Sequence, residues 1–268
     1  MSNNSLALEE WCRLARDWAR HAGAIQRRYY HDPASKNIEH KGEIDLVTAA
    51  DKECEDYLVA QIQQQHPTHG YVCEEGHEKT GESGLTWHVD PLDGTTNFSH
   101  GYPVFCVSIA LARGDDVLLG VIYDPMRDEL FSAVQGGGAY MNELPIHVTG
   151  EKRLEKSLLV SGFPYSFATD ERNLKLWGAF LHSSLSVRRD GSAALDLCYV
   201  ACGRFEGFWE FGLNPWDVAA GTLIVNEAGG RSTNFDGTPL ILNGRNILAT
   251  NGWVHAPMQQ VLRDNGAL

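Results

Sequence analysis

Two aspartates set three residues apart are the first feature of this chain that could do chemistry. Residues 90–97 read Asp-Pro-Leu-Asp-Gly-Thr-Thr-Asn, and the run 86–89 before them predicts the end of a buried strand. Pro91 fixes its own φ and favours an extended Asp90, so the backbone leaves that strand stiffly. Carboxylates this close repel each other, and a cation that prefers oxygen ligands, such as Mg²⁺, removes the repulsion.

The residues after the second aspartate favour an anion. Gly94 has no Cβ, so a ligand can approach the main chain there. Thr95 and Thr96 can begin a short helix whose first N–H groups would face the same place, and such groups bind phosphate. The alternative is an ordinary Asp-Gly turn. A second Asp-Gly-Thr, at 236–238, has no acid three residues upstream, and we interpret that copy as a plain turn.

Four further acids could join this site, and each also has a simpler explanation. Glu74 follows a short apolar strand, where an acid can merely solvate a loop. Asp51 and Asp217 each fall at the third position of a predicted helix, after a threonine or asparagine that can cap it, so capping and function stay open for both. Glu210 stands among aromatic residues in a predicted strand over 207–211, either exposed at an edge or directed into a pocket.

Composition and charge exclude some partners. The 268 residues carry 22 Lys and Arg against 35 Asp and Glu, a net charge of −13, whereas a broad nucleic-acid surface needs a basic stripe. An acidic protein can still take an anionic substrate if bound cations reverse the local field. The six cysteines form no Cys-x-x-Cys pair, which disfavours a zinc ribbon. With no secretory pattern and no apolar run of membrane-spanning length, we expect a soluble cytoplasmic protein that binds no membrane.

The elements that must position these acids include both helices and strands. Helical spacing of apolar residues predicts helices over 6–30 and 170–183. The side chains expected to face inward on the second helix are Leu174, Leu176, Trp177, Phe180 and Leu181. Short strands joined by tight turns over 102–140 predict an antiparallel sheet. A shift in composition near 145–156 divides the chain into two halves.

Together these motifs resemble the inositol monophosphatase family. The segments that carry the resemblance are 45–51 (Asp-Leu-Val-Thr-x-x-Asp), Glu74-Glu75, 90–97, and 216–221 (Trp-Asp-Val-Ala-Ala-Gly). They occur in the family's order over nearly the whole chain, and four in order are more specific than any one alone. The resemblance implies an α/β fold, a layered αβαβα sandwich. It also implies one domain over 1–268, with structural halves at about 1–150 and 151–268, and usually a homodimer.

The activity that the resemblance implies is Mg²⁺-dependent hydrolysis of a small phosphate monoester, with inositol monophosphate as the expected substrate and frequent inhibition by Li⁺. The two or three metal ions would be held by Glu74, Asp90, the main-chain carbonyl of Leu92, Asp93 and Asp217. Thr95, hydrogen-bonded to Asp51, would position the attacking water, and Glu74 would share in catalysis. Contacts to the substrate would come from Asp93, Gly94, Thr95, Gly191, Ser192, Ala193, Glu210 and Asp217. Lys41 falls where the family has a mobile basic residue near the metals.

The sequence leaves other readings open. The same scaffold serves histidinol phosphate, fructose 1,6-bisphosphate and 3′-phosphonucleotides, although Glu210 favours a polyol hydroxyl over a base. A non-catalytic regulatory protein could keep the fold as a docking surface, but it would not need the acids. A zinc hydrolase would be expected to show a His-Glu-x-x-His motif, and a serine hydrolase a Gly-x-Ser-x-Gly elbow; the chain has neither.

Overall fold

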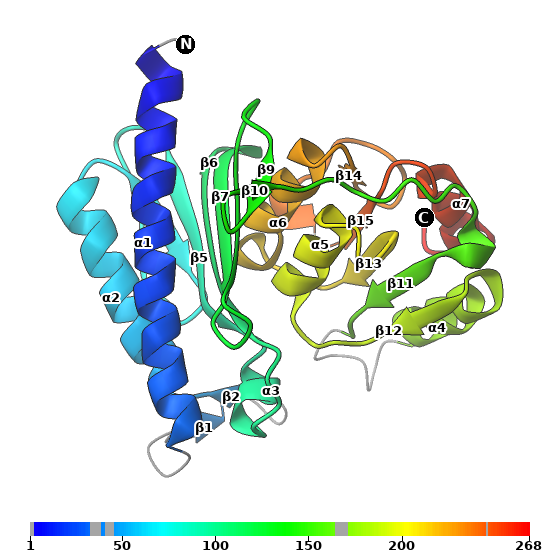
Figure 1. The fold of residues 1–268 in the computed structure, drawn as a ribbon, viewed down its shortest axis with the longest axis horizontal. Coiled ribbons are helices and arrows are strands. Elements are labelled where there is room, and N and C mark those ends of the chain that lie inside the picture. Colours follow the sequence, from blue (N-terminus) through cyan, green and yellow to red (C-terminus); the bar gives the residue numbers. More distant parts are fainter. Residues whose placement is uncertain (1–2, 33–38, 41–45, 164–170, 245) are drawn as a thin grey trace.

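The structure, a computed structural model, describes residues 3–32, 39–40, 46–163, 171–244 and 246–268. Its α-helices are α1 (Asn3–His31), α2 (Ala49–Gln65), α3 (Thr95–Ser99), α4 (Arg172–Ser183), α5 (Ala193–Ala201), α6 (Pro215–Glu227) and α7 (His255–Asp264). Short 3₁₀ turns are η2 (Leu154–Lys156) and η3 (Leu242–Gly244). The layers run α1 and α2, a large sheet, α5 and α6, a smaller sheet, then α4 and α7, which is the expected αβαβα order (Figure 1).

The larger sheet has eight strands. They are β3 (Gly70–Cys73), β4 (Glu78–Lys79), β5 (Thr86–Asp93), β6 (Cys106–Arg113), β7 (Asp116–Asp124), β8 (Glu129–Val134), β9 (Ala139–Met141) and β10 (Leu144–Pro145). Their order is β10-β9-β8-β7-β6-β5-β3-β4. Each pair from β5 to β10 is antiparallel, as the tight turns predict, whereas β3 runs parallel to β5.

Both faces of this sheet are covered because its strands carry apolar residues on both sides. In β8, Leu130 and Val134 join the core beneath α1 and α2. Phe131 and Ala133, on the opposite face, join the core against α5 and α6. Alternation along a strand sends successive side chains to opposite faces, so the sheet becomes the second of the five layers rather than an outer wall.

The smaller sheet has five strands in the order β12-β11-β13-β15-β14. Their bounds are β11 (Leu158–Ser161), β12 (Ser186–Arg188), β13 (Gly207–Phe211), β14 (Arg231–Thr233) and β15 (Asn246–Thr250). A short two-stranded antiparallel ladder, β1 (Glu39–His40) with β2 (Leu46–Val47), precedes α2. Among the described residues, no helix is long and apolar enough to cross a membrane.

Helix α4 corrects one expectation about burial. Leu176 and Phe180 are buried as predicted, but Leu174 is 60% exposed and Leu181 is 50% exposed. Positions 174 and 181 lie two turns apart on one face of the helix. Since α4 lies in the outermost layer, against β12 and α7, only the stripe that carries Leu176 and Phe180 has a neighbour to bury it.

Candidate active site

The first two acids meet because β3 and β5 are parallel neighbours. Cys73, the last residue of β3, is paired with Val89 of β5, so Glu74 and Asp90 follow at neighbouring positions. The Glu74 N–H donates to the Val89 carbonyl at 3.2 Å. The Asp90 Oδ1 accepts a 2.9 Å hydrogen bond from the Leu92 N–H, which holds the carboxylate in place. Acids outside the carboxyl ends of parallel strands typically line a ligand site.

Strand β5 is irregular between its two acids, Asp90 and Asp93, and both side chains line one cavity. The pairing of β5 with β6 shifts register between Asp90 and Asp93. Gln26, a fully buried residue of α1, supports the irregular backbone through its Nε2, which donates to the carbonyls of Pro91 at 2.8 Å and Cys106 at 3.2 Å. The sequence analysis did not identify Gln26, whose only signal was an amide in an otherwise apolar stripe.

Asp93 is anchored to the second half of the chain. Its Oδ2 accepts hydrogen bonds from the Ser192 hydroxyl at 2.7 Å and from the Ala194 N–H at 2.8 Å, where α5 begins. Ser192 is the N-cap of α5. The predicted substrate segment 191–193 is therefore fixed in place by one of the predicted metal ligands.

Asp217 reaches the site through β6. Ser108 is the strand partner of Asp90, and its Oγ donates to the carbonyl of Trp216 at 3.0 Å. Asp217 follows as the third residue of α6, and its Oδ2 accepts from the Asn214 N–H at 2.7 Å in a capping box. The capping interpretation of Asp217 is therefore confirmed, and the same residue also lines the cavity described below.

Thr95 and Asp51 form the expected pair. The Thr95 Oγ1 lies 3.1 Å from the Asp51 Oδ1. Asp51 is fully buried at the start of α2 and completes a capping box with Thr48, so here too a capping residue faces the site. Gly94, with φ of 99°, makes the turn into α3. A Cβ on Gly94 would lie 2.8 Å from the Val104 carbonyl oxygen, so the close approach requires glycine.

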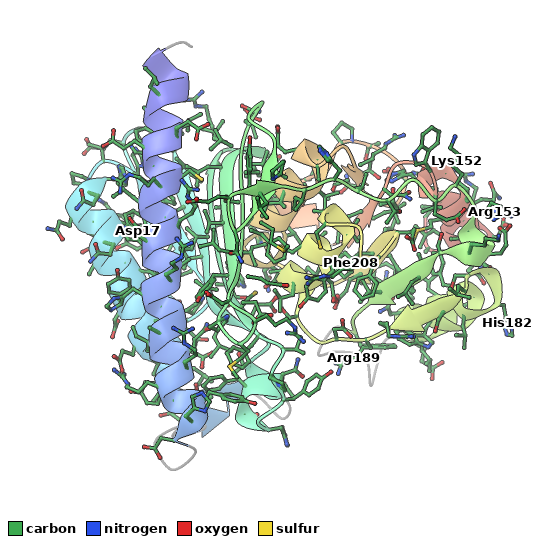
Figure 2. All side chains as sticks on the ribbon, viewed as in Figure 1. Asp17, Lys152, Arg153, His182, Arg189 and Phe208 are labelled. Atoms are coloured by element: carbon green, nitrogen blue, oxygen red, sulfur yellow. The ribbon has the colours of Figure 1, made fainter. Side chains whose placement is uncertain are left out.

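These residues surround one cavity of about 150 Å³. Its lining includes every predicted metal ligand and every predicted substrate contact, whereas Asp51 lies behind Thr95. Lining residues that the sequence analysis did not single out include Asn97, Gly162, Phe163, Arg189 and Asp196. Arg189 is exposed and extends from the chain just after β12 (Figure 2). Lys41 lies outside the described residues.

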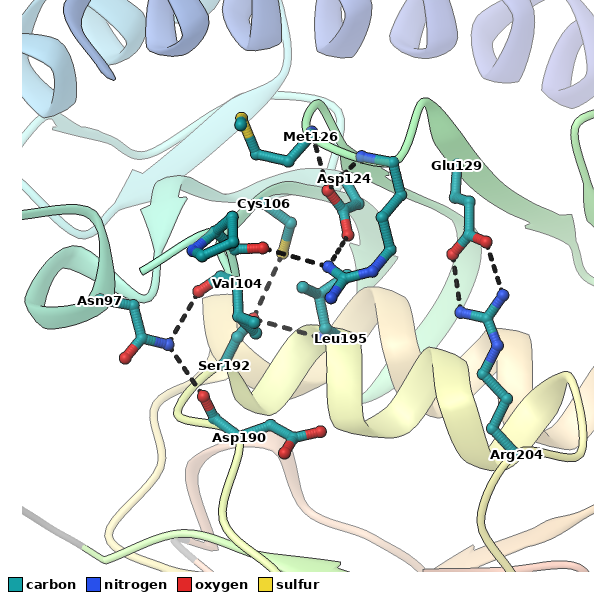
Figure 3. A network of polar contacts seen from close by, with 12 residues as sticks. Asn97, Val104, Cys106, Asp124, Met126, Glu129, Asp190, Ser192, Leu195 and Arg204 are labelled. Carbon is teal, nitrogen blue, oxygen red and sulfur yellow. Dashed lines mark hydrogen bonds and ion pairs between the residues drawn. The ribbon is translucent and has the colours of Figure 1, made fainter. Parts of the chain in front are cut away.

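Asn97 holds the wall that carries Gly191. Its Nδ2 donates at 2.8 Å to the carbonyls of both Val104 and Asp190, which ties α3 to the segment before α5 (Figure 3). A Cβ on Gly191, whose φ is 85°, would lie 3.0 Å from the Asn97 amide. Glycine at 191 therefore lets the second half of the chain approach the first at this point.

The acids that line the cavity raise one another's pKa values. Burial raises the pKa of Asp90 well above its ordinary value, and the charges of Glu74, Asp93 and Asp217 raise it further. Burial likewise raises the pKa of Glu210, with Asp217 and Asp93 adding to the effect. Such a cluster is stabilised by a cation.

Among the residues described, however, no group of three or more His, Cys, Asp or Glu side chains could hold a metal ion in its present arrangement. The carboxylates have the right chemistry for a hard cation. They would have to move closer together around it.

Comparison with known proteins agrees with the geometry. The model of the inositol monophosphatase family matches residues 7–265. An inositol-1-monophosphatase of Synechocystis is 46% identical over 230 residues, 85% of this chain and 80% of that protein. The Nus factor SuhB of Escherichia coli is 40% identical over 250 residues, 92% and 93% of the two chains. The structure of an inositol monophosphatase from Anabaena superposes with a TM-score of 0.87 at 41% identity, covering 96% of this chain and 97% of that one.

Proposed function

Since the chain belongs to the inositol monophosphatase family, we propose that it is a Mg²⁺-dependent phosphatase of small phosphate monoesters, with inositol monophosphate as the first candidate substrate. The observation that carries the proposal is the placement of Glu74, Asp90, Asp93 and Asp217 around one cavity. A phosphate ester would be repelled from such a site unless cations were bound there too.

The proposed ligands of two or three Mg²⁺ ions are Glu74, Asp90, the Leu92 carbonyl, Asp93 and Asp217. When bound, the ions would lower the pKa of a water molecule and stabilise the oxygen of the leaving alcohol. Asp90 would be shared, because its carboxylate has the other three acids as charged neighbours. A bound cation would oppose the repulsion from those acids, which adds to the effect of burial in raising the pKa of Asp90.

Thr95 and Asp51 would orient the attacking water. If the Thr95 hydroxyl donates its proton to Asp51 across their 3.1 Å contact, the hydroxyl oxygen keeps its lone pairs free to accept from water in the cavity. Glu74, on the same side as Asp90, would be the further acceptor for that water. We expect Gly94 and the Thr95 N–H to hold phosphate oxygens, and the segment 191–193 with Glu210 to contact the alcohol.

The test is phosphate release by the purified full chain from inositol 1-phosphate, histidinol phosphate, fructose 1,6-bisphosphate and 3′-phosphoadenosine 5′-phosphate. We expect release from inositol 1-phosphate with Mg²⁺, loss of activity in EDTA, restoration by excess Mg²⁺, and inhibition by millimolar Li⁺. If the protein releases phosphate from none of the four substrates with Mg²⁺ present, the proposal is refuted.

A regulatory role is the second candidate, because the Escherichia coli relative is named a Nus factor. The acid cluster disfavours it as the sole role, since a docking protein would not need buried carboxylates that destabilise one another. A chain that folds normally but releases no phosphate would favour this second candidate.

We also propose that the protein is a cytoplasmic homodimer and that its two halves form one domain. Light scattering on a size-exclusion column measures the mass of the particle in solution and so tests the dimer directly. A mass equal to the 29.7 kDa of one chain at micromolar concentration would contradict the dimer.

A further inference from the structure

Asp196 is a buried acid, and one of its carboxylate oxygens has no hydrogen-bond partner among the residues that the structure describes. It is 1% exposed, in a helix whose nine residues are all buried. Its Oδ1 is buried and has no hydrogen-bond partner in the described part of the chain. Burying a carboxyl group without a partner costs free energy of folding, about 1–3 kcal/mol for a neutral polar group and more for a charged one. The other residues of α5 are apolar apart from Tyr199 and Cys198, so packing alone gives no reason for an acid here.

The position of Asp196 suggests why the acid is there. Asp196 lines the same cavity as the predicted metal ligands. The charged groups that influence it are the acids Asp190, Glu210 and Asp93, with Arg189 opposing them. Those that influence Asp90 are Glu74, Asp93 and Asp217. Asp90 and Asp196 therefore line one cavity and share Asp93 as a charged neighbour.

Glu210 lines the same cavity as Asp196. It is 6% exposed, and its carboxylate accepts a hydrogen bond from the Gly162 N–H. Burial raises the pKa of Asp196 well above its ordinary value, with Asp190, Glu210 and Asp93 adding to the effect. A carboxyl group can accept a hydrogen bond in either protonation state, and an alcohol hydroxyl can donate one.

We propose that Asp196 is a substrate-binding residue that, together with Glu210, hydrogen-bonds the hydroxyls of the alcohol part of the phosphate monoester. The inference rests on the proposed phosphatase function and deepens it by assigning Asp196 a part in recognising the alcohol. The substrate then supplies the hydrogen-bond partner that the Asp196 Oδ1 lacks. The free energy that burying this oxygen costs the folded protein is regained when the substrate binds.

The experiment compares two kinds of substrate in the full-length protein with Mg²⁺. One is whichever of inositol 1-phosphate and fructose 1,6-bisphosphate the wild type uses better, since both carry further hydroxyls on the alcohol part. The other is p-nitrophenyl phosphate, whose leaving group has no further hydroxyl. Asp196→Leu keeps a similar volume without hydrogen bonds, and Asp196→Asn keeps shape and hydrogen bonding. Tyr199→Phe is the matched control: its hydroxyl is also buried and unpartnered, but Tyr199 does not line the cavity.

We expect Asp196→Leu to raise KM for the hydroxylated substrate, lowering kcat/KM about tenfold or more, as for loss of one hydrogen bond in a buried site. The value for p-nitrophenyl phosphate should change less than about twofold, and the melting temperature should not fall. Asp196→Asn should lose less, and Tyr199→Phe nothing.

Equal changes for both substrates, or no change for either, would overturn the inference and leave a purely structural role. If Asp196→Leu fails to fold, Asp196→Ala decides, because it also removes the carboxyl group, and an unchanged ratio of the two kcat/KM values in that variant refutes the assignment. Failure of the proposed function itself would be recognised separately, because the wild type would then release no phosphate with Mg²⁺.

Discussion

Asp93 serves both the fold and the proposed chemistry. Its Oδ2 accepts hydrogen bonds from Ser192 and Ala194, and the residue also lines the cavity with the other proposed metal ligands. Asp93→Asn can keep the amide oxygen in the place of Oδ2. We therefore expect turnover to fall about a thousandfold or more, because a charge facing the metals is lost, while the fold survives. Phosphate release and circular dichroism check the two halves of the prediction.

A near wild-type rate in Asp93→Asn would make the metal assignment wrong. Loss of folding together with loss of activity would be uninformative about charge, so Ser192→Ala is a useful companion. It removes the hydroxyl that donates to Asp93 but no charge, and we expect only a modest fall in rate.

Capping and function are compatible at the level of single residues. Asp51 and Asp217 both complete capping boxes, and both lie at the candidate site. A helix N-terminus stabilises a nearby carboxylate, so an acid at the third helical position is already held rigidly. A carboxylate has two oxygens, so one side chain can cap a helix and also face the site. The spacing of residues in the sequence therefore could not decide between capping and function.

At the level of elements, the end of β11 controls the acid on β13. Gly162 follows β11, and a Cβ there would overlap the Glu210 carboxylate. Gly162→Ala should displace Glu210 and raise KM for the hydroxylated substrate about tenfold, at an overpacking cost of about 1–3 kcal/mol in stability. Steady-state kinetics and urea unfolding would measure both effects.

Gly178→Ala is the matched control for that change. A Cβ at Gly178 on α4 meets nothing within 4 Å, so the kinetics should not change, and helix propensity should add up to about 1 kcal/mol of stability. If Gly162→Ala also left KM unaltered, Glu210 would not be a substrate contact.

The packing of α2 against α1 and β5 predicts sensitivity to acid. His66, just after α2, stacks on His69 at a ring-centroid distance of 4.8 Å and meets Trp11 edge-on at 5.2 Å. Burial, and secondarily His69, lowers the pKa of His66 from 6.5 to about 4. Unfolded His66 therefore binds a proton first, so its stabilising effect is complete above pH 6.5 and is lost as pH falls toward 4.

This prediction is measured as the free energy of unfolding in urea between pH 7 and pH 4.5. The slope attributable to His66 should approach, at most, about 1.4 kcal/mol per pH unit, and His66→Gln should lose it. Exposed His147→Gln is the control. The buried acids of the site act in the opposite direction, so the difference between variant and wild type is the relevant quantity. Parallel profiles for wild type and His66→Gln would refute the prediction.

At the level of the whole molecule, one core joins the two sheets. Phe131 and Ala133 from β8 share a buried cluster with Phe208 from β13, through residues of α5 and α6. A core that draws on both halves favours joint unfolding. We therefore expect a single transition in urea, with coincident midpoints for far-ultraviolet circular dichroism and tryptophan fluorescence. Two separated transitions would show that the halves are independent domains.

The sequence alone determined the features that depend on neighbours along the chain. The capping positions of Thr48, Ser192 and Asn214 are confirmed, because a cap involves residues within one helical turn. The antiparallel meander and the plain turn at 236–238 follow from local turn chemistry in the same way. The resemblance of the motifs also identified the family, because four short segments in a fixed order can be recognised without knowledge of the fold.

Only the tertiary structure decided which of these residues meet. The hydrogen bond between Asp93 and Ser192 joins residues 99 apart in the chain, and Asp217 reaches Asp90 only through the pairing of β5 with β6 and the bond from Ser108. Which layer covers which face likewise decides that Leu174 and Leu181 are exposed. It also decides that the Oδ1 of Asp196 is buried without a hydrogen-bond partner among the described residues. Burial and long-range contact are properties of the packed layers, and the pattern within any one helix or strand does not contain them.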